Sequence, residues 1–256
     1  MAVTATETGS KGRIVAPPTM AELAADELRR MILAGDLALG ERLVESRLTE
    51  QLGVSRPPLR EALQSLMHEG LVVARPPRGL IVRPLTRHDV YEIVTLREDL
   101  EALAMGLAVP VRSAADLEPC RAALRAFEEA GRSGDEGLFT QRKFDFHLSL
   151  VALAGHGRLT EAYRALSLQM QLCMALNRTA LRDRESLMEN VERHRELLEI
   201  IEAGDPDAAQ RALADHGHSF FLIDVVDRLD GGTQASEAWL VRRRERTMAR
   251  SEATRG

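Results

Sequence analysis

The chain has 256 residues, of which 45% are hydrophobic and 29% charged, and a formal net charge of −5, a composition that fits a globular protein of about two domains. No apolar run approaches the roughly 18 residues of a membrane-spanning helix, and the N-terminal segment lacks the apolar core of a signal peptide. The two cysteines, Cys120 and Cys173, form neither a CxxC pair nor a disulfide framework. These features argue against a membrane or secreted protein, and we expect a cytoplasmic one with reduced thiols.

The first regular elements are predicted to be two helices. Apolar residues recur at helical spacing over 20–33, where Thr19 and Glu22 can form a capping box and Gly35 can stop the helix. A turn and a short extended piece follow. A second helix is then predicted over 45–52.

The third predicted helix begins at Ser55 and carries two prolines in its first turn. Serine is a favoured N-cap because its hydroxyl accepts a backbone N–H that has no intrahelical partner. Pro57 and Pro58 fit there, because the first-turn N–H groups that they lack would be unpaired in any case. The buried face is predicted from four apolar residues, Leu59, Ala62, Leu63 and Leu66. Arg56 and Arg60 lie one turn apart on another face.

Two β-prone runs follow the third helix. They cover 71–73 and 80–82, and the turn between them contains proline and glycine, with Arg75 and Arg78 near its tip. Residues 55–85 hold five arginines against two glutamates, which gives this block a basic surface although the whole chain is acidic. Helix, helix, turn, helix and hairpin in this order predict a winged helix-turn-helix.

The rest of the chain shows helical periodicity. Six helices are predicted, over 89–109, 114–131, 136–155, 159–179, 187–203 and 206–229. We therefore expect a mainly α protein with four parts: a flexible tail (1–18), a winged helix-turn-helix domain with a small β-hairpin wing (19–85), an all-α bundle of six to seven helices (86–229) and a basic C-terminal tail (230–256). The last part could form a short helix, but a solvated tail is favoured.

These patterns resemble a known family. The first block is similar to the GntR-type winged helix-turn-helix over its whole length, through Gly40-Glu41-Arg42-Leu43, Val54-Ser55-Arg56, Arg60-Glu61-Ala62-Leu63, Glu69-Gly70-Leu71-Val72 and Arg78-Gly79. The helical part resembles the FCD ligand-binding domain of the FadR subgroup through LREDLEALA, FHLSLVALAGHGRL and HRELLEIIEAGDPDAAQRAL. The resemblance implies a dimeric transcription regulator, often a repressor, whose operator binding changes when a small metabolite, frequently a carboxylic acid, occupies the C-terminal domain.

The resemblance and the spacing both predict that Arg56 and Arg60 contact DNA bases. A recognition helix inserts its N-terminal end into the major groove, where arginine can bond bidentately to guanine. The alternative is that the two arginines form ordinary surface pairs, for example with Glu61 or Glu69.

Four more residues complete the predicted DNA-binding set. Ser55 could bond a phosphate at the helix N-terminus. Pro58 matches a position that touches DNA in the family, and Arg78 and Gly79 belong to the wing. Pro57 departs from the family pattern, which usually has threonine there, so one hydroxyl contact to DNA is in doubt.

Three histidines match the metal positions of FCD domains, many of which hold a divalent ion through one aspartate and three histidines. His147, His194 and His216 fall on separate predicted helices, as a site inside a bundle requires, and imidazole suits zinc, nickel, manganese or iron. The usual aspartate position holds Lys143, while Asp145 should point away. Either water or the effector completes a three-histidine metal site, or no metal binds and Lys143 holds an anionic ligand.

Arg97 matches a family arginine that faces the ligand cavity, where a guanidinium would bind a carboxylate bidentately. Its alternative partner is Glu101, four residues on, in an ordinary helix ion pair. Asn177 and Arg178 could line the same cavity. Together with Lys143, these residues form the predicted effector site.

The sequence thus predicts a DNA-binding transcription regulator and not an enzyme. We expect a homodimer that binds double-stranded DNA at a pseudo-palindromic operator and responds to a small carboxylate metabolite. Two alternatives are a metal-dependent hydrolase built on the histidines and a DNA-binding protein without an effector. The first lacks an HExxH motif and a clearly placed general base, and the second leaves the histidine-lined bundle unexplained.

Overall fold

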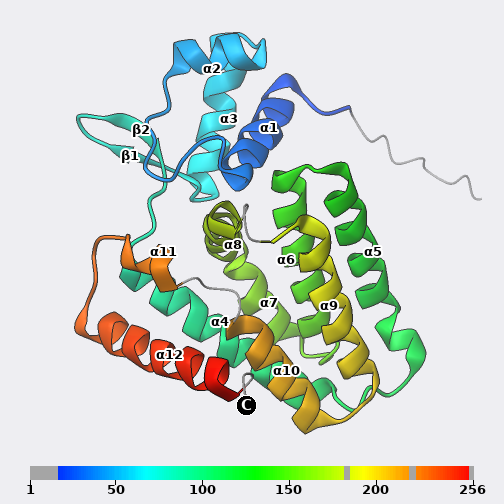
Figure 1. Ribbon diagram of the computed structural model, residues 1–256. Helices are drawn as coiled ribbons and strands as arrows, with labels where there is room; N and C mark the ends of the chain where they lie inside the picture. The colour runs from blue at the N-terminus through cyan, green and yellow to red at the C-terminus, as the bar shows by residue number, and fades with distance from the viewer. Residues whose placement is uncertain (1–16, 182–184, 219–222, 254–256) are drawn as a thin grey trace, which may run out of the picture.

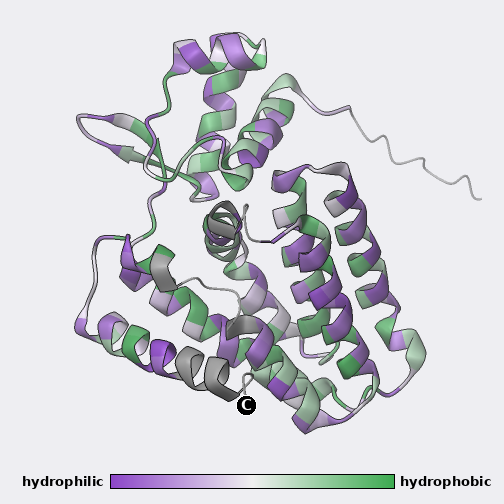
Figure 2. Cartoon of the chain, viewed as in Figure 1, coloured by the Kyte–Doolittle hydropathy of each residue, from purple (hydrophilic) through white to green (hydrophobic). Residues whose placement is uncertain are grey.

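The computed structural model describes residues 17–181, 185–218 and 223–253, so the expected N-terminal tail lies almost entirely outside the described residues (Figure 1). The protein is mainly helical, with a winged helix-turn-helix at one end and a helical bundle below it. The helices of the bundle carry both hydrophobic and hydrophilic residues (Figure 2), as amphipathic helices around a shared core do.

The winged part follows the predicted order of elements. Its elements are α1 (Met20–Ala34), α2 (Glu45–Leu52), α3 (Arg56–His68), β1 (Val72–Arg75) and β2 (Gly79–Val82). The predicted capping box of Thr19 and Glu22 is present, and Gly35 ends α1 with a left-handed φ of 83°. The two strands form an antiparallel hairpin with Val72 opposite Val82. The predicted stripe of α3 is buried at all four positions.

The bundle contains more helices than the periodicity predicts. The elements are α4 (Arg87–Ala108), the 3-10 turn η1 (Ala114–Leu117), α5 (Glu118–Ser133), α6 (Glu136–Ala152), α7 (Gly157–Ala165), α8 (Ser167–Leu181), α9 (Leu187–Glu202), α10 (Pro206–His218), α11 (Ile223–Asp227) and α12 (Gln234–Ala253). The predicted helix over 159–179 is wrong in one respect, because Leu166, with φ −88° and ψ 0°, leaves the helical conformation and separates α7 from α8. The predicted helix over 206–229 corresponds to α10 and α11, and residues 219–222 between them lie outside the described residues.

The C-terminal segment is not the solvated tail that we expected. It forms α12, which buries Ser236, Trp239, Leu240 and Arg243. Trp239 packs edge-on against Tyr91 of α4, with ring centroids 5.8 Å apart, and Arg243 binds Glu98 at 2.9 Å. These buried positions are spaced as one helix face, a pattern that the many arginines of the segment obscure.

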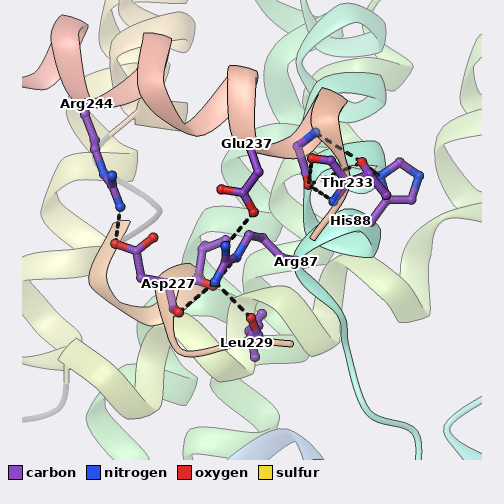
Figure 3. A network of polar contacts seen from close by, with 9 residues as sticks. Arg87, His88, Asp227, Leu229, Thr233, Glu237 and Arg244 are labelled. Carbon is purple, nitrogen blue, oxygen red and sulfur yellow. Dashed lines mark hydrogen bonds and ion pairs between the residues drawn. The ribbon is translucent and has the colours of Figure 1, made fainter. Parts of the chain in front are cut away.

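A polar network holds α12 and the end of α11 to the start of α4 (Figure 3). Arg87 pairs with Glu237 at 2.5 Å and also donates to the carbonyl oxygens of Asp227 and Leu229. Arg244 pairs with Asp227 from the other side. Arg87, in the first turn of α4, therefore links this helix to α11 and α12, which lie much later in the chain.

The winged part is joined to the bundle by the packing of α1 against α6. At Gly137 of α6, an added Cβ atom would lie 2.5 Å from the backbone oxygen of Arg30. Leu33 is buried in this contact region, and the hydroxyl of Thr140 points to its carbonyl oxygen at 3.5 Å. The approach is close because glycine has no side chain. The helix that touches the winged part also carries Lys143 and His147.

Candidate functional site

The N-terminal end of α3 faces solvent. Ser55 is the N-cap in extended conformation, and Arg56, Pro57 and Pro58 occupy the first three helical positions. Our expectation that the serine hydroxyl caps the helix is wrong, since it makes no capping hydrogen bond. The reason is chemical: an N-cap side chain accepts from the N–H groups of the second and third helical residues, and here both are prolines. The Ser55 hydroxyl is therefore not used by the helix.

The two arginines of α3 differ in their contacts. Arg60 pairs with Glu45 of α2 at 3.1 Å, not with Glu61 or Glu69 as the alternative interpretation had it, and its side chain is 65% exposed. Arg56 is exposed and forms no ion pair with any part of the chain that the structure describes. An ion pair this exposed is worth 1 kcal/mol or less, as a rough figure. Both guanidinium groups can thus be turned toward another molecule at small cost.

The wing presents its tip in the same open manner. Arg78 donates its backbone N–H to the Arg75 carbonyl oxygen at 2.7 Å, which closes the turn, and its side chain is exposed. Gly79 has φ of 81°, a conformation that favours glycine, and nothing lies within 4 Å of the place where its Cβ would be. A second molecule can therefore approach the backbone at the wing.

The three predicted histidines meet in the interior of the bundle. His147 of α6 and His194 of α9 are fully buried, and His216 of α10 is 7% exposed. Their potential ligand nitrogens all lie within 4.8 Å of one another. Nε2 of His194 is 3.1 Å from Nε2 of His216, so one of these rings donates a proton to the other. Three separate helices thus bring three imidazoles to one point.

Two of the imidazoles are oriented by groups on their far side. Nδ1 of His194 lies 2.6 Å from the backbone oxygen of Asn190, to which it donates, so its Nε2 is an acceptor. Nδ1 of His147 lies 3.2 Å from the Glu101 carboxylate. Histidines that bind metals are oriented in the same way, with the second nitrogen donating to a carbonyl or carboxylate oxygen.

One pair of these nitrogens already has the spacing of two ligands on a shared transition-metal ion. Two imidazole nitrogens that share one ion at about 2.1 Å lie about 3.0–3.4 Å apart in octahedral or tetrahedral geometry, and the observed 3.1 Å between His194 and His216 falls in this range. Burial, with the Arg97 charge added, lowers the pKa of His147 to about 4. Burial also lowers the pKa of His194 and His216, so all three rings are neutral near pH 7 and can act as ligands.

Arg97 does not point into an open cavity. Its Nε binds Glu101 at 2.9 Å, and its Nη2 lies 3.2 Å from Nδ1 of His147. The hydroxyl of Tyr163, from α7, donates to the same Glu101 carboxylate at 2.6 Å. Although burial alone would raise it, Arg97 and His147 hold the pKa of Glu101 below its usual range. Sequence reasoning treated Glu101 only as a competing partner of Arg97 and missed Tyr163.

Lys143 is buried at the usual aspartate position, one helical turn before His147. Burial, together with the positive charges of Arg193 and Arg97, lowers the pKa of Lys143. Asp145 points away, as predicted, since it pairs with Arg142 at 2.9 Å on the outside of α6. No aspartate therefore completes the histidine cluster among the described residues.

The two remaining effector candidates belong to α8, and both are buried. Arg178 donates to the backbone oxygen of Glu185 at 2.8 Å. The carboxylate of Glu185 accepts from Asn190 and Arg193 of α9 at 2.7 Å each. Asn177 is 2% exposed. The described residues thus place a second polar cluster, rich in positive charge, next to Lys143.

The interior beside the histidines is closely packed. The hollow lined by Glu101, Met105 and His147 leaves no room for a water molecule. A surface hollow of about 270 Å³ between α9 and α10 reaches His216 from outside, where Arg193 and Asp215 line it. A ligand larger than an ion would need the helices to separate.

The chain is similar in sequence to known bacterial regulators. Residues 20–82 match the family of bacterial regulatory proteins named gntR, and residues 92–219 match the FCD domain. The chain is 31% identical over 218 residues to the "Probable D-xylose utilization operon transcriptional repressor" of Paenarthrobacter nicotinovorans, covering 85% of this chain and 93% of that protein. It is 28% identical to the HTH-type transcriptional regulator McbR of Escherichia coli, covering 74% and 86%.

Solved structures are similar as well. A GntR transcriptional regulator from Rhodococcus sp. RHA1 superposes with a TM-score of 0.61 at 27% identity, covering 78% of this chain and 94% of that one. Among the described residues, none of the helices has the length and apolar character that crossing a membrane requires. The comparisons give no support to a hydrolase. The chain belongs to the GntR family of bacterial regulatory proteins and carries an FCD domain, which makes it a transcription regulator and not an enzyme.

Proposed function

We propose that this regulator binds a pseudo-palindromic operator as a homodimer and represses transcription, with 19–85 as its DNA-binding domain and 86–229 as its effector domain. The observation that supports this proposal most directly is the solvent-exposed N-terminal end of α3. Arg56 and Arg60 are exposed there, on either side of the two prolines that make the first turn rigid. A helix end of this kind enters the major groove. The Paenarthrobacter nicotinovorans relative is named a probable transcriptional repressor, which supports repression as the direction of control.

Each proposed DNA contact has a chemical role. Arg56 and Arg60 read base edges, and Arg60 exchanges its pair with Glu45 for a base. The Ser55 hydroxyl donates to a phosphate at the helix N-terminus, where Pro58 contacts the backbone. In the wing, Arg78 reaches an adjacent phosphate, and Gly79 allows the backbone to come close.

Mobility-shift titrations with DNA from upstream of the protein's own gene test this proposal. Arg56→Ala and Arg60→Ala should each weaken specific binding by roughly 5-fold to 150-fold, as expected for about 1–3 kcal/mol per bidentate arginine. Arg132→Ala is the matched control, because Arg132 is an equally exposed arginine on α5. If both α3 variants bind the operator with the affinity of the control variant, the proposed role of α3 in base recognition is wrong.

For the effector domain, we propose that His147, His194 and His216 hold a divalent transition-metal ion, such as zinc, nickel, manganese or iron. FCD domains of this family can bind metals, and the closeness and neutrality of the three rings support one here. Such an ion would supply a Lewis acid for a carboxylate oxygen. Lys143, Arg97, Asn177 and Arg178 would bind the anionic groups of a small carboxylate metabolite. Lys143, in the usual aspartate position, would be protonated when such an anionic group binds beside it, because the anion offsets the burial that lowers its pKa.

The effector signal would pass along α6. This helix carries Lys143 and His147 in its middle and contacts α1 at Gly137. Because the interior is packed without room for a ligand, effector binding must displace helices around the site. Displacement of α6 would move α1, and with it the position of α3 relative to the operator.

Metal analysis of the purified protein and thermal-shift screening of carboxylates test the effector proposal. We expect about one transition-metal ion per chain in the wild type and in His68→Ala, which changes an exposed histidine of α3, and loss of the ion in His194→Ala. Stabilisation by a carboxylate that also releases the operator would identify the effector class. If no preparation contains a metal, before or after reconstitution, the proposed metal site is wrong. Lys143 would then be the centre of an anion-binding site.

A further inference from the structure

The C-terminal segment of the chain lies against the start of α4, where the winged part joins the bundle. The residues that match the FCD domain end at 219, so α11 and α12 lie beyond both family matches. Polar contacts run from this segment to the first turn of α4 (Figure 3). We call residues 225–244 the C-terminal strap.

The connection between the winged part and α4 is very short. The backbone N–H of Arg83 donates to the Leu71 carbonyl oxygen at 2.8 Å, which holds Arg83 in the winged part. Thr86 is already the N-cap of α4. Only Pro84, whose ring fixes φ, and the buried Leu85 lie between them. A change in the direction of the first turn of α4 would therefore be passed on to the winged part.

Arg87, in this first turn, makes the side-chain contacts to the strap. Its guanidinium pairs with Glu237 of α12 at 2.5 Å. It also donates to three backbone carbonyl oxygens at the end of α11, those of Val226, Asp227 and Leu229. A cation is a suitable partner there, because the last carbonyl groups of a helix lack intrahelical donors. The Arg87 side chain is 21% exposed, so these contacts are partly shielded from water.

The backbone of the first turn is held as well. The N–H group of Arg87 cannot bond within α4, because it lies at the first helical position, and it donates to the Asp230 carbonyl oxygen at 2.9 Å. At Gly231, which has φ of 74°, an added Cβ atom would lie 3.0 Å from the Cβ of Thr86, so this loop packs directly on the N-cap. The end of a helix opens more easily than its middle, and here the strap covers that end.

The strap is anchored farther along α4 by a second set of contacts. Trp239 packs against Tyr91 with ring centroids 5.8 Å apart. Arg243, which is 4% exposed, binds Glu98 at 2.9 Å and lies 5.1 Å from the centre of the Trp239 ring. These contacts are enough to fix α12 on α4. The contacts of Arg87 lie one helical turn earlier, beside the connection to the winged part.

We propose that the C-terminal strap positions the winged part by holding the first turn of α4, with Arg87 as the positioning residue. While the turn is held, Pro84 and Leu85 lead into the winged part in one direction. When the strap is released, the turn opens and the winged part takes a wider range of orientations.

This loss of direction has a defined effect on DNA binding. A full operator needs both winged parts of a dimer at once, and a winged part with variable direction has a lower effective concentration at the second half-site. A single half-site is bound by α3 and the wing alone, so its affinity does not depend on the strap. The effect on the operator rests on the proposed homodimer, whereas the effect on the first turn of α4 does not.

Hydrogen exchange of the full-length chain measures the effect on the first turn. In Arg87→Ala, the amides of 85–89 should exchange about 10-fold faster or more, because partly buried hydrogen bonds from a charged group are lost. Arg125→Ala, which removes an exposed ion pair with Glu118 on α5, is the control and should exchange like the wild type. Glu237→Gln, at a side chain that is 50% exposed, should have a smaller effect in the same direction, and it replaces Arg87→Ala if that variant does not fold.

DNA titrations distinguish positioning of the winged part from local stability. The full operator is located by footprinting in DNA upstream of the protein's own gene, and an isolated half-site is made from it. Arg87→Ala and Glu237→Gln should bind the full operator roughly 5-fold more weakly or worse and bind the half-site as the wild type does. Arg125→Ala should bind both as the wild type does.

The possible outcomes separate this proposal from the proposed homodimer. Unchanged exchange at 85–89 overturns the role of the strap. Faster exchange with full-operator affinity equal to that of Arg125→Ala overturns it too, because the strap then only stabilises α4, and so does an equal loss at the half-site, which means that the winged part is damaged. A wild type that binds the full operator no more tightly than the half-site contradicts two-fold binding instead, and hydrogen exchange then decides the role of the strap alone.

Discussion

At the start of α3 the polar groups are unused, whereas around the histidines almost every polar group already has a partner. Arg56 and the Ser55 hydroxyl face solvent without an ion pair or a cap. In the bundle, a single carboxylate, Glu101, accepts from Arg97, Tyr163 and His147. The first region is ready to exchange water for a second molecule. The second must break internal contacts before it can bind one, so ligand binding there is coupled to a change in packing.

The largest effect should come from removing the shared carboxylate. Glu101→Ala leaves the Arg97 guanidinium buried without its counter-charge, which should lower the free energy of unfolding by about 3–5 kcal/mol. Urea unfolding followed by circular dichroism measures this. Glu118→Ala removes the carboxylate of an exposed glutamate–arginine pair and should leave stability unchanged. Equal stability of the two variants would mean that water enters the site and that the comparison of the two regions is wrong.

Acid should act on the bundle next most strongly. The pKa of His147 is lowered from 6.5 to about 4, so between these values the unfolded chain binds a proton that the folded chain does not. Stability therefore falls as pH drops below 6.5, by roughly 2 kcal/mol from this group between pH 7 and 5. His194 and His216 shift in the same direction and add to the loss. Unfolding of His147→Gln should show a smaller pH dependence, and an equal one would refute the buried, neutral assignment.

The junction of the two regions can be tested at Gly137. Its Cβ would lie 2.5 Å from the Arg30 backbone oxygen, so Gly137→Ala must push α1 away from α6. Overpacking lowers the free energy of unfolding by about 1–3 kcal/mol, whereas the higher helix propensity of alanine raises it by about 1 kcal/mol. The net change is a loss of roughly 1 kcal/mol of stability. Gly157→Ala, in a helix with open space around that position, should be neutral or stabilising. Thermal unfolding separates them, and an unharmed Gly137→Ala would show that the junction is loose.

Local signals explain why the winged part could be predicted closely from the sequence. Thr19, Glu22 and Gly35 fix both ends of α1 by hydrogen bonds and backbone conformation within a few residues. The break at Leu166 was missed because an apolar residue continues the helical pattern across it. The burial of α12 was missed because Trp239 meets Tyr91 of α4, a contact that no local pattern contains.

The histidine site lies between these cases. Spacing and family resemblance indicated His147, His194 and His216, and the structure brings their rings together. What the pattern could not give is the direction of each ring, because the carbonyl of Asn190, the carboxylate of Glu101 and the hydroxyl of Tyr163 reach the site from different helices. Tertiary packing, not the sequence motif, determines that Arg97 pairs with Glu101 in the interior instead of facing an open cavity.

The smallest effect concerns Ser55 at the N-cap position of α3, and it distinguishes a hydroxyl that caps a helix from one that does not. Thr19 accepts from the backbone N–H of Glu22 at 3.1 Å, so Thr19→Ala should cost about 1 kcal/mol of stability. Ser55 occupies the same position on α3 but faces two prolines, so Ser55→Ala should change stability by less than about 0.3 kcal/mol. Chemical denaturation of both variants measures the difference. If Ser55→Ala also leaves operator affinity unchanged, the hydroxyl has no role at all. If affinity falls while stability does not, the two prolines have released a phosphate-binding group that an ordinary helix would have used for itself.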